Sequence, residues 1–217
     1  MTFVLILLAI QNFVPRLEDH LLSRMMDLTF SGDTENNFSD EDRRSVRFKK
    51  MYETKTFRVN YTTYDIRRDQ DYINSDKRAD IMVHSPEVKD NPRAHPYWYG
   101  RVLLVFHIDA SSSLNTLNGK FLQSQKFEVL LVRWYGILNS ERCGARIGRL
   151  PKVGFVDEED DYAFSFLNPL HVIRACHLMP SFNDGEMQLL KTVNPTIARR
   201  KGAGIEEWEF YYVGMYV

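Results

Sequence analysis

The chain has 217 residues, enough for one large domain, and 44% of them are hydrophobic, enough to fill a packed core. Its 28 basic and 29 acidic residues give a net charge of −1. The whole chain therefore has no field that attracts nucleic acid, and any such contact needs a local basic patch. The two cysteines, Cys143 and Cys176, are too few for a disulfide scaffold and form no C-x-x-C pair of the zinc-ribbon type.

The chain begins with an apolar run from Phe3 to Ile10, which we group in an apolar start of residues 1–14. The run is too short to span a bilayer, which takes about 20 residues. No Lys or Arg precedes it and no small-residue cleavage site follows it. We therefore expect a buried strand or helix rather than a signal peptide or membrane anchor, and a misread gene start is the third interpretation.

Residues 15–53 form a lead-in with helical and charged segments. Leu17, Leu21, Met25 and Leu28 recur at spacings of three to four, which predicts an amphipathic helix with Pro15 in its first turn. Ser39 is expected to cap a second, short helix. The basic residues that follow are candidate phosphate contacts or a solvated face: Arg43, Arg44, Arg47, Lys49 and Lys50.

From residue 54 to 217 the hydrophobic pattern changes to the alternation of β-strands. We expect strands at 56–64, 79–85, 97–109, 126–136, 171–182 and 207–217, with a short apolar piece, an acidic loop and aromatics between 150 and 169. The polar stretch after the first strand, through Asn74, is expected to be a loop in which Arg67 and Arg68 are candidate phosphate contacts.

The strand at 97–109 has a wholly apolar face, made of Trp98, Gly100, Val102, Leu104, Phe106 and Ile108. A glycine in the middle of a strand often marks a bulge or a sharp bend, so we expect one at Gly100.

Catalytic and metal-binding templates are not matched. The sequence has no nucleophile elbow, P-loop, dinucleotide fingerprint or H-E-x-x-H motif. His171 and His177 lack a third ligand, and Cys176 and His177 would point to opposite faces of a strand. The acidic run Asp157 to Asp161 lacks the EF-hand spacing, so it is a solvated loop or, as a lesser alternative, the metal site of a nuclease. We predict no catalytic residue, metal or cofactor.

Aromatic residues gather at the ends of the expected strands beside glycine or polar loops. Such residues form either a core or a cage for a cationic ligand, for example a methylated ammonium group. The residues concerned are Trp98, Tyr99, Trp134, Tyr135, Phe164 and Phe166.

The segments "HPYWYGRVLLVFHID", "FEVLLVRWYG" and "AFSFLNPLHVIRACHLMPSF" resemble a bromo-adjacent homology (BAH) domain, over roughly residues 80–180. Members of that family that read methyl-lysine hold it in a cage of aromatic residues. The resemblance assigns these cage positions to Trp98, Trp134 and Phe166 of this chain. An acidic residue a few positions after the tryptophan often assists, and here Glu141 lies somewhat late.

A second resemblance covers nearly the whole chain. "FVPRLEDHLL", "FRVNYTTYDIRRDQDYIN", "RLPKVGFV" and "WEFYYVGMYV", among others and in this order, are similar to the C-terminal region of Plavaka-type transposon proteins of mushroom-forming fungi, related to KDZ transposases. Those proteins carry an upstream transposase core and continue past the last strand. The resemblance implies a fragment or degenerate copy whose apolar start is former internal sequence.

We therefore expect a mainly β fold with a few helices: a small BAH-like β-barrel or sandwich with an N-terminal helix. The expected function is a non-catalytic, transposon-derived interaction domain, nuclear, that binds a histone tail or another protein and no membrane. The alternatives are a DNA-binding accessory piece of a transposase and a decayed fragment without function.

Overall fold

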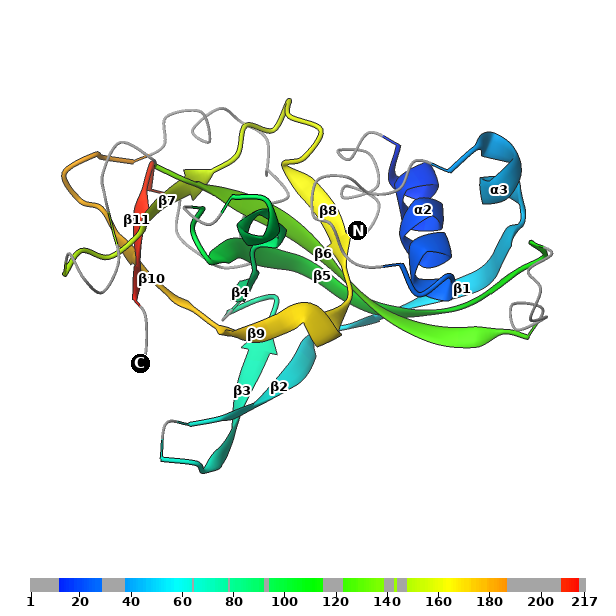
Figure 1. Ribbon diagram of the computed structural model, residues 1–217, viewed down its shortest axis with the longest axis horizontal. Helices are drawn as coiled ribbons and strands as arrows, with labels where there is room; N and C mark the ends of the chain where they lie inside the picture. The colour runs from blue at the N-terminus through cyan, green and yellow to red at the C-terminus, as the bar shows by residue number, and fades with distance from the viewer. Residues whose placement is uncertain are drawn as a thin grey trace.

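The computed structural model describes residues 12–28, 38–63, 65–77, 79–91, 94–114, 123–138, 143, 148–186 and 208–214. The predicted mainly β fold with an N-terminal helix is confirmed (Figure 1). The helical elements are α2 (Phe13–Met25), α3 (Asp40–Arg44), and the 3-10 turns η1 (Pro86–Lys89) and η3 (Pro169–His171). The strands are β1 (Val46–Thr54), β2 (Thr56–Thr62), β3 (Arg68–Asn74), β4 (Asp80–His84), β5 (Tyr97–Ser112), β6 (Gln125–Ile137), β7 (Lys152–Phe155), β8 (Phe164–Leu167), β9 (Val172–Ala175), β10 (His177–Pro180) and β11 (Tyr211–Gly214).

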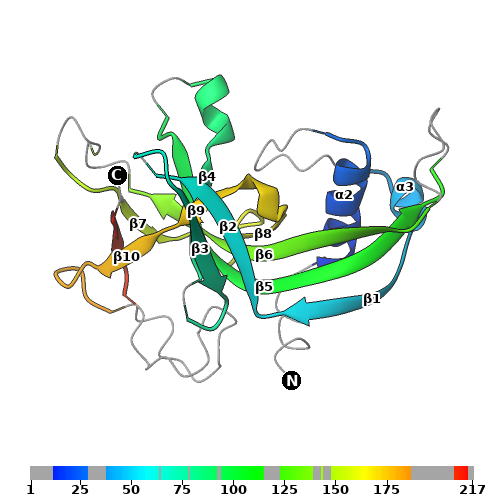
Figure 2. The same ribbon diagram turned by 90° about the horizontal axis from the view of Figure 1, so that it is seen from below.

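The described strands form one nine-stranded antiparallel sheet and one two-stranded sheet. The large sheet has the order β10-β11-β7-β6-β5-β4-β9, with β1 added to β5 and β8 added to β6. Only Cys176 separates β9 from β10 in the chain. The first and last strands of this order are therefore continuous in sequence, and the sheet curls back on itself like a barrel (Figure 2).

A bulge in β5 divides its apolar residues between the two faces of the sheet. The pairing with β6 shifts between Val102 and Leu104. Val102 then packs with the β4 residues Ile81 and Val83, whereas Leu104 packs in the cluster beneath α2. The expected single apolar face from Trp98 to Ile108 is therefore wrong, because one extra residue reverses the alternation.

Gly100 lies just before this bulge, in regular pairing with Ile81 and Trp134. The bulge is therefore two to four residues later than we expected. Gly100 is needed for another reason: a Cβ there would lie 2.4 Å from Val132 Cγ1 and 2.9 Å from Trp134 Cε3.

Helix α2 covers one face of the long strand pair β5–β6. Its buried positions include Leu17, Leu21 and Met25 of the predicted stripe, together with Leu22. Leu28 lies beyond the end of the helix and is exposed. The short helix α3 begins at the predicted cap, where Ser39 and Asp42 form a reciprocal capping box.

Three expectations about the strands were wrong. β1 extends the sheet back to Val46, into the segment that we assigned to the lead-in. Residues 68–74, expected to be a loop, form β3 and pair with β2 along its whole length. The single strand expected at 171–182 is divided at Cys176, whose N–H donates to the Asp80 carbonyl at 2.9 Å.

Candidate functional site

The structure does not bring the three predicted cage residues together. The rings of Trp98 and Trp134 meet edge to face at 5.8 Å on the outer face of the barrel. Trp134 is only 7% exposed, and its Nε1 donates to Ser165 Oγ at 2.6 Å. Both tryptophans therefore act as packing residues there.

Phe166 lies on the opposite face of the sheet from the tryptophan pair. It is buried beneath α2, with its ring 5.0 Å from Phe13 and 6.3 Å from Phe106. Phe166 pairs with Leu131, which lies three residues before Trp134 on β6, so the alternation of β6 places Phe166 and Trp134 on opposite faces. The predicted assisting acid, Glu141, lies outside the described residues.

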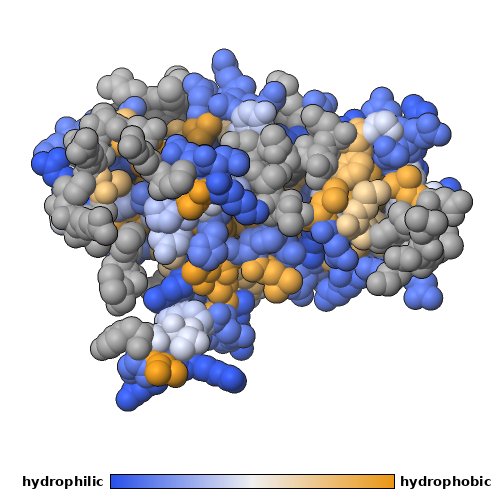
Figure 3. Space-filling model, viewed as in Figure 1, coloured by the Kyte–Doolittle hydropathy of each residue, from blue (hydrophilic) through white to orange (hydrophobic). Residues whose placement is uncertain are grey.

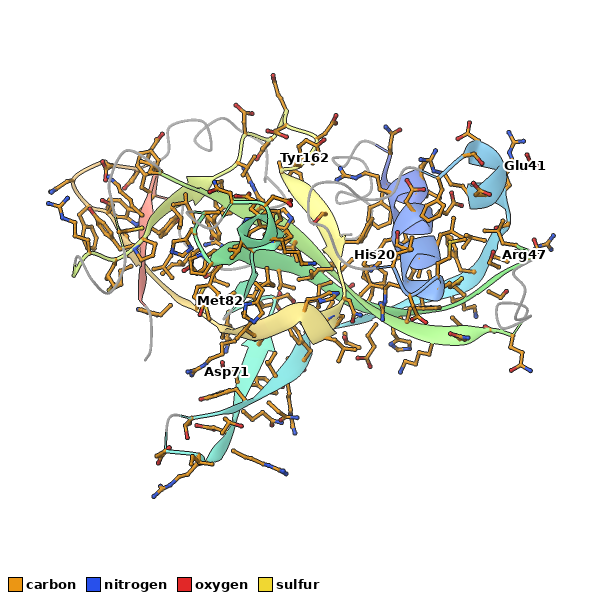
Figure 4. All side chains as sticks on the ribbon, viewed as in Figure 1. His20, Glu41, Arg47, Asp71, Met82 and Tyr162 are labelled. Atoms are coloured by element: carbon orange, nitrogen blue, oxygen red, sulfur yellow. The ribbon has the colours of Figure 1, made fainter. Side chains whose placement is uncertain are left out.

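The predicted phosphate contacts fall in two separate places. Arg43 donates from Nε and Nη2 to the two carboxylate oxygens of Asp19 at 2.7 and 2.8 Å, so it ties α3 to α2. Arg44 and Arg47 are exposed near this helical end. Figure 4 shows Arg47 there, far from Asp71 at the base of the β2–β3 hairpin.

Lys50 is exposed on β1, and the side chain of Lys49 lies outside the described residues. Arg67 and Arg68 lie on the β2–β3 hairpin. The single basic face that the DNA-binding alternative required is therefore not assembled from all of these residues.

The β2–β3 hairpin projects from the body of the molecule, past β9 (Figure 1). Its strands alternate strictly, because residues opposite each other in an antiparallel pair share a face. One face, here called the anchor face, comprises Phe57, Val59, Tyr61, Asp69, Asp71 and Ile73. The other, here called the ribbon face, comprises Arg58, Asn60, Thr62, Arg68, Gln70 and Tyr72.

The anchor face fixes the hairpin to the sheet. Phe57, Val59 and Ile73 pack on the outer cluster that holds Trp134. Arg174 of β9 lies over the Tyr61 ring at 3.8 Å and donates to Asp71 at 3.4 Å. The Asp71 carboxylate also accepts from the Ala175 N–H at 3.0 Å. Apolar burial and a charge-assisted network therefore both orient the base.

The ribbon face is exposed at these six positions, and Thr56 and Asn74, the next pair toward the body, are half-buried. Gln70 Nε2 donates to Asn60 Oδ1 at 2.7 Å, and the Arg58 guanidinium lies 5.7 Å from the centre of the Tyr72 ring. Beside these residues is an open hollow of about 580 Å³. It is lined by Asn60, Tyr61, Thr62, Arg68, Asp69 and Gln70.

The barrel interior contains a second cluster of polar side chains, and this cluster is closed to solvent. The Asp80 carboxylate accepts from Arg101 Nε at 2.9 Å and from the Tyr135 hydroxyl at 3.0 Å. Asp80 and Arg101 are each 5% exposed. The Arg101 guanidinium also lies 5.0 Å from the Phe155 ring. An ion pair enclosed in this way orients the strands that it joins.

Cys176 lies beside this pair. Burial, and then the charge of Asp80, raise the pKa of its thiol well above the usual value. The thiol is therefore protonated at neutral pH, which makes it a poor nucleophile or metal ligand.

Side chains of the acidic loop after β7 accept hydrogen bonds from the loop's own backbone and form an ion pair with the sheet. Asp157 accepts from the Glu159 N–H and Asp160 from the Tyr162 N–H, and Glu158 pairs with Arg133 at 2.9 Å. Within the described ranges, no three His, Cys, Asp or Glu side chains form a group that could hold a metal ion. Among those residues, no helix is long and apolar enough to cross a membrane.

Comparison with protein-family models, with curated proteins and with solved structures finds no match to this chain.

The sequence showed half of the ribbon face but not its partner strand. The alternation of β2 placed Arg58, Asn60 and Thr62 together. β3 has one buried apolar residue, Ile73, so its pattern does not stand out as a strand. The available signal was its own alternation, in which Arg68, Gln70 and Tyr72 oppose Asp69, Asp71 and Ile73.

Proposed function

We propose that this chain is a non-catalytic binding module that contacts a chromatin partner through the β2–β3 hairpin. The observation that carries this proposal is the division of the hairpin into a fixed anchor face and a fully exposed ribbon face. A two-stranded hairpin is marginally stable alone, and here the body of the protein holds it in place. The outward side chains contribute little to that anchoring, so they are available to a partner.

The roles of the reactive side chains favour binding over catalysis. Asp80 and Arg101 neutralise each other inside the barrel, and the Cys176 thiol is held protonated. Asp157 and Asp160 accept hydrogen bonds from their own loop. These side chains are therefore engaged in internal contacts, whereas a catalytic reaction would need them exposed to a substrate.

The choice of chromatin, and with it a nuclear location, comes from the resemblance to BAH domains and transposon proteins. The aromatic cage of that resemblance gains no support from the geometry, because Phe166 lies across the sheet from the tryptophans. The hairpin takes its place as the proposed contact surface.

The test is binding of the full chain to mononucleosomes, measured by fluorescence anisotropy. In the test variant an Asn-Gly turn replaces residues 60–70, which keeps Val59, Asp71 and Ile73 at the anchored base. We expect the wild type to bind and this variant to lose at least tenfold in affinity.

The matched control is the double variant Arg44→Gln/Arg47→Gln, which removes two exposed charges from the helical end. It should bind like the wild type. Equal affinity of the wild type and the trimmed variant, with both folded by circular dichroism, would show that the hairpin is not the contact surface.

A further inference from the structure

We infer that the ribbon face binds duplex DNA by entering the major groove. This inference rests on the proposed function and names its partner. Three observations carry it: the dimensions of the hairpin, the distribution of its charges, and the amide pair at its centre.

The dimensions fit the groove. The major groove of B-form DNA is about 12 Å wide and about 8.5 Å deep, and it admits a two-stranded β-ribbon. Neighbouring strands lie about 4.8 Å apart, and a seven-residue strand is about 23 Å long. β2 and β3 each have seven residues, and the hairpin projects from the body of the molecule (Figure 1).

The charges of the hairpin are separated by face. The ribbon face carries Arg58 and Arg68 and no carboxylate, and neither arginine forms an ion pair with any described residue. Asp69 and Asp71 lie on the anchor face, where they accept hydrogen bonds from Tyr61 and from Arg174. The ribbon face therefore presents positive charge to a polyanion although the chain as a whole is nearly neutral.

The tip adds a third arginine. Arg67 pairs with Asp65 at 3.0 Å, and its side chain is 84% exposed. An ion pair this exposed is easily exchanged for a phosphate contact. We therefore expect about three phosphate contacts from the hairpin.

The amide pair supplies groups that read base edges. Because Gln70 Nε2 donates to Asn60 Oδ1, the Gln70 carbonyl oxygen can still accept a hydrogen bond and the Asn60 NH₂ group can still donate one. One acceptor beside one donor matches the N6 and N7 atoms of adenine in the major groove. The pair is exposed at the middle of the ribbon face.

The hairpin is less suited to single strands, which bind by stacking bases on aromatic rings. Arg58 lies over the Tyr72 ring, and Arg174 lies over the Tyr61 ring. Among the described hairpin residues, both tyrosine rings thus already have a cation as a neighbour. Figure 3 shows the projecting part of the hairpin as mainly hydrophilic, in keeping with a polar groove as its environment.

The experiment titrates the full chain against a fluorescent 25-base-pair DNA duplex between 50 and 200 mM salt. Three phosphate contacts predict that affinity falls roughly 40-fold over this range, from a slope of about −0.9 per contact. The variant Arg58→Gln/Arg68→Gln should keep one contact and lose only about 3.5-fold over the same range.

The control variant Arg44→Gln/Arg47→Gln removes the same charge at the other end of the molecule and should keep the wild-type salt dependence. An RNA duplex of the same sequence should bind at least tenfold more weakly, because the major groove of A-form helices is too narrow for a ribbon. Equal loss in both double variants, or equal binding of the two duplexes, would overturn the groove assignment.

The inference and the proposed function can fail separately. A chain that binds nucleosomes through its hairpin but binds no free DNA at 50 mM salt would refute the DNA inference and point to a histone surface. A chain that binds DNA through Arg58 and Arg68 but ignores nucleosomes would support the inference and refute the chromatin proposal.

Discussion

His20 is a buried residue whose protonation state is coupled to folding. It is 7% exposed, its ring lies 6.0 Å from that of Phe166, and its Nε2 has no hydrogen-bond partner among the described residues. Figure 4 shows it on α2. Burial, and then the charges of Arg24 and His171, lower its pKa from 6.5 to about 3.

This pKa predicts acid sensitivity. Between pH 6.5 and about 3 the unfolded chain binds a proton that the folded chain does not. The contribution of His20 to the free energy of unfolding is therefore fully present above pH 6.5 and falls by about 1.4 kcal/mol per pH unit below it. Urea unfolding of wild type and His20→Leu at pH 7.0, 6.0 and 5.0 measures the difference.

The variant should lose less stability than the wild type as the pH falls. The exposed His177→Gln serves as the control and should follow the wild type. Parallel curves for wild type and His20→Leu would contradict the buried, neutral imidazole.

The Asp80–Arg101 pair predicts a large cost for an asymmetric change. Asp80→Asn leaves the Arg101 guanidinium buried without its counter-charge, so we expect a loss of about 3–5 kcal/mol in the free energy of unfolding. Tyr135→Phe removes one hydrogen bond to the same carboxylate and should cost about 1 kcal/mol. Chemical denaturation compares the two with the exposed control Asp161→Asn, and equal costs for all three would rule out a structural pair.

At the scale of elements, the close packing of β5 on β6 sets the position of the outer tryptophans. A methyl group at Gly100 would overlap Val132 and the Trp134 ring. At Gly136 the nearest atom to such a group is Val156 Cγ2 at 3.8 Å, an ordinary contact. The two glycines of this strand pair therefore differ in what they tolerate.

Gly100→Ala should destabilise the protein by about 1–3 kcal/mol because two strands or a buried indole must move. Gly136→Ala should change the free energy of unfolding by less than about 0.5 kcal/mol. Thermal unfolding of both variants checks the contrast. A melting temperature equally lowered in both would show that strand flexibility, and not the contact with Trp134, decides the cost.

The sequence predicted elements well where burial is one-sided and the alternation unbroken. The stripe Leu17, Leu21 and Met25 predicted α2, and the apolar middle of β6 predicted a central strand. β1 and β3 were missed because charged residues occupy at least half of their exposed positions, so strand pairing rather than apolar content defines them. The bulge after Val102 was misplaced because its cause lies in the pairing with β6.

At the scale of the whole molecule, three parts have different roles. The barrel interior contains the Asp80–Arg101 pair, and the helical end packs α2 on β5, β6 and β8. The hairpin uses its anchor face to join the barrel near Trp98 and Trp134. The first two parts are buried, and the hairpin exposes a row of polar side chains.

The candidate site was only partly predictable from the sequence, because it depends on strand pairing. Arg67 and Arg68 were candidate phosphate contacts, and the pairing of β2 with β3 places Arg68 on one face with Arg58, Asn60 and Gln70. The cage failed because β8 pairs Phe166 with Leu131, and the alternation of β6 places Leu131 and Trp134 on opposite faces. The sequence shows which residue types are present, but the face of the sheet on which each side chain lies depends on the pairing register of the strands.

Hydrogen exchange of the wild-type chain with and without mononucleosomes tests most directly whether the hairpin is the contact surface. Binding through the hairpin predicts slower amide exchange across residues 58–73 and no change in α2. Slower exchange confined to α3 and β1, with the hairpin unchanged, would contradict it.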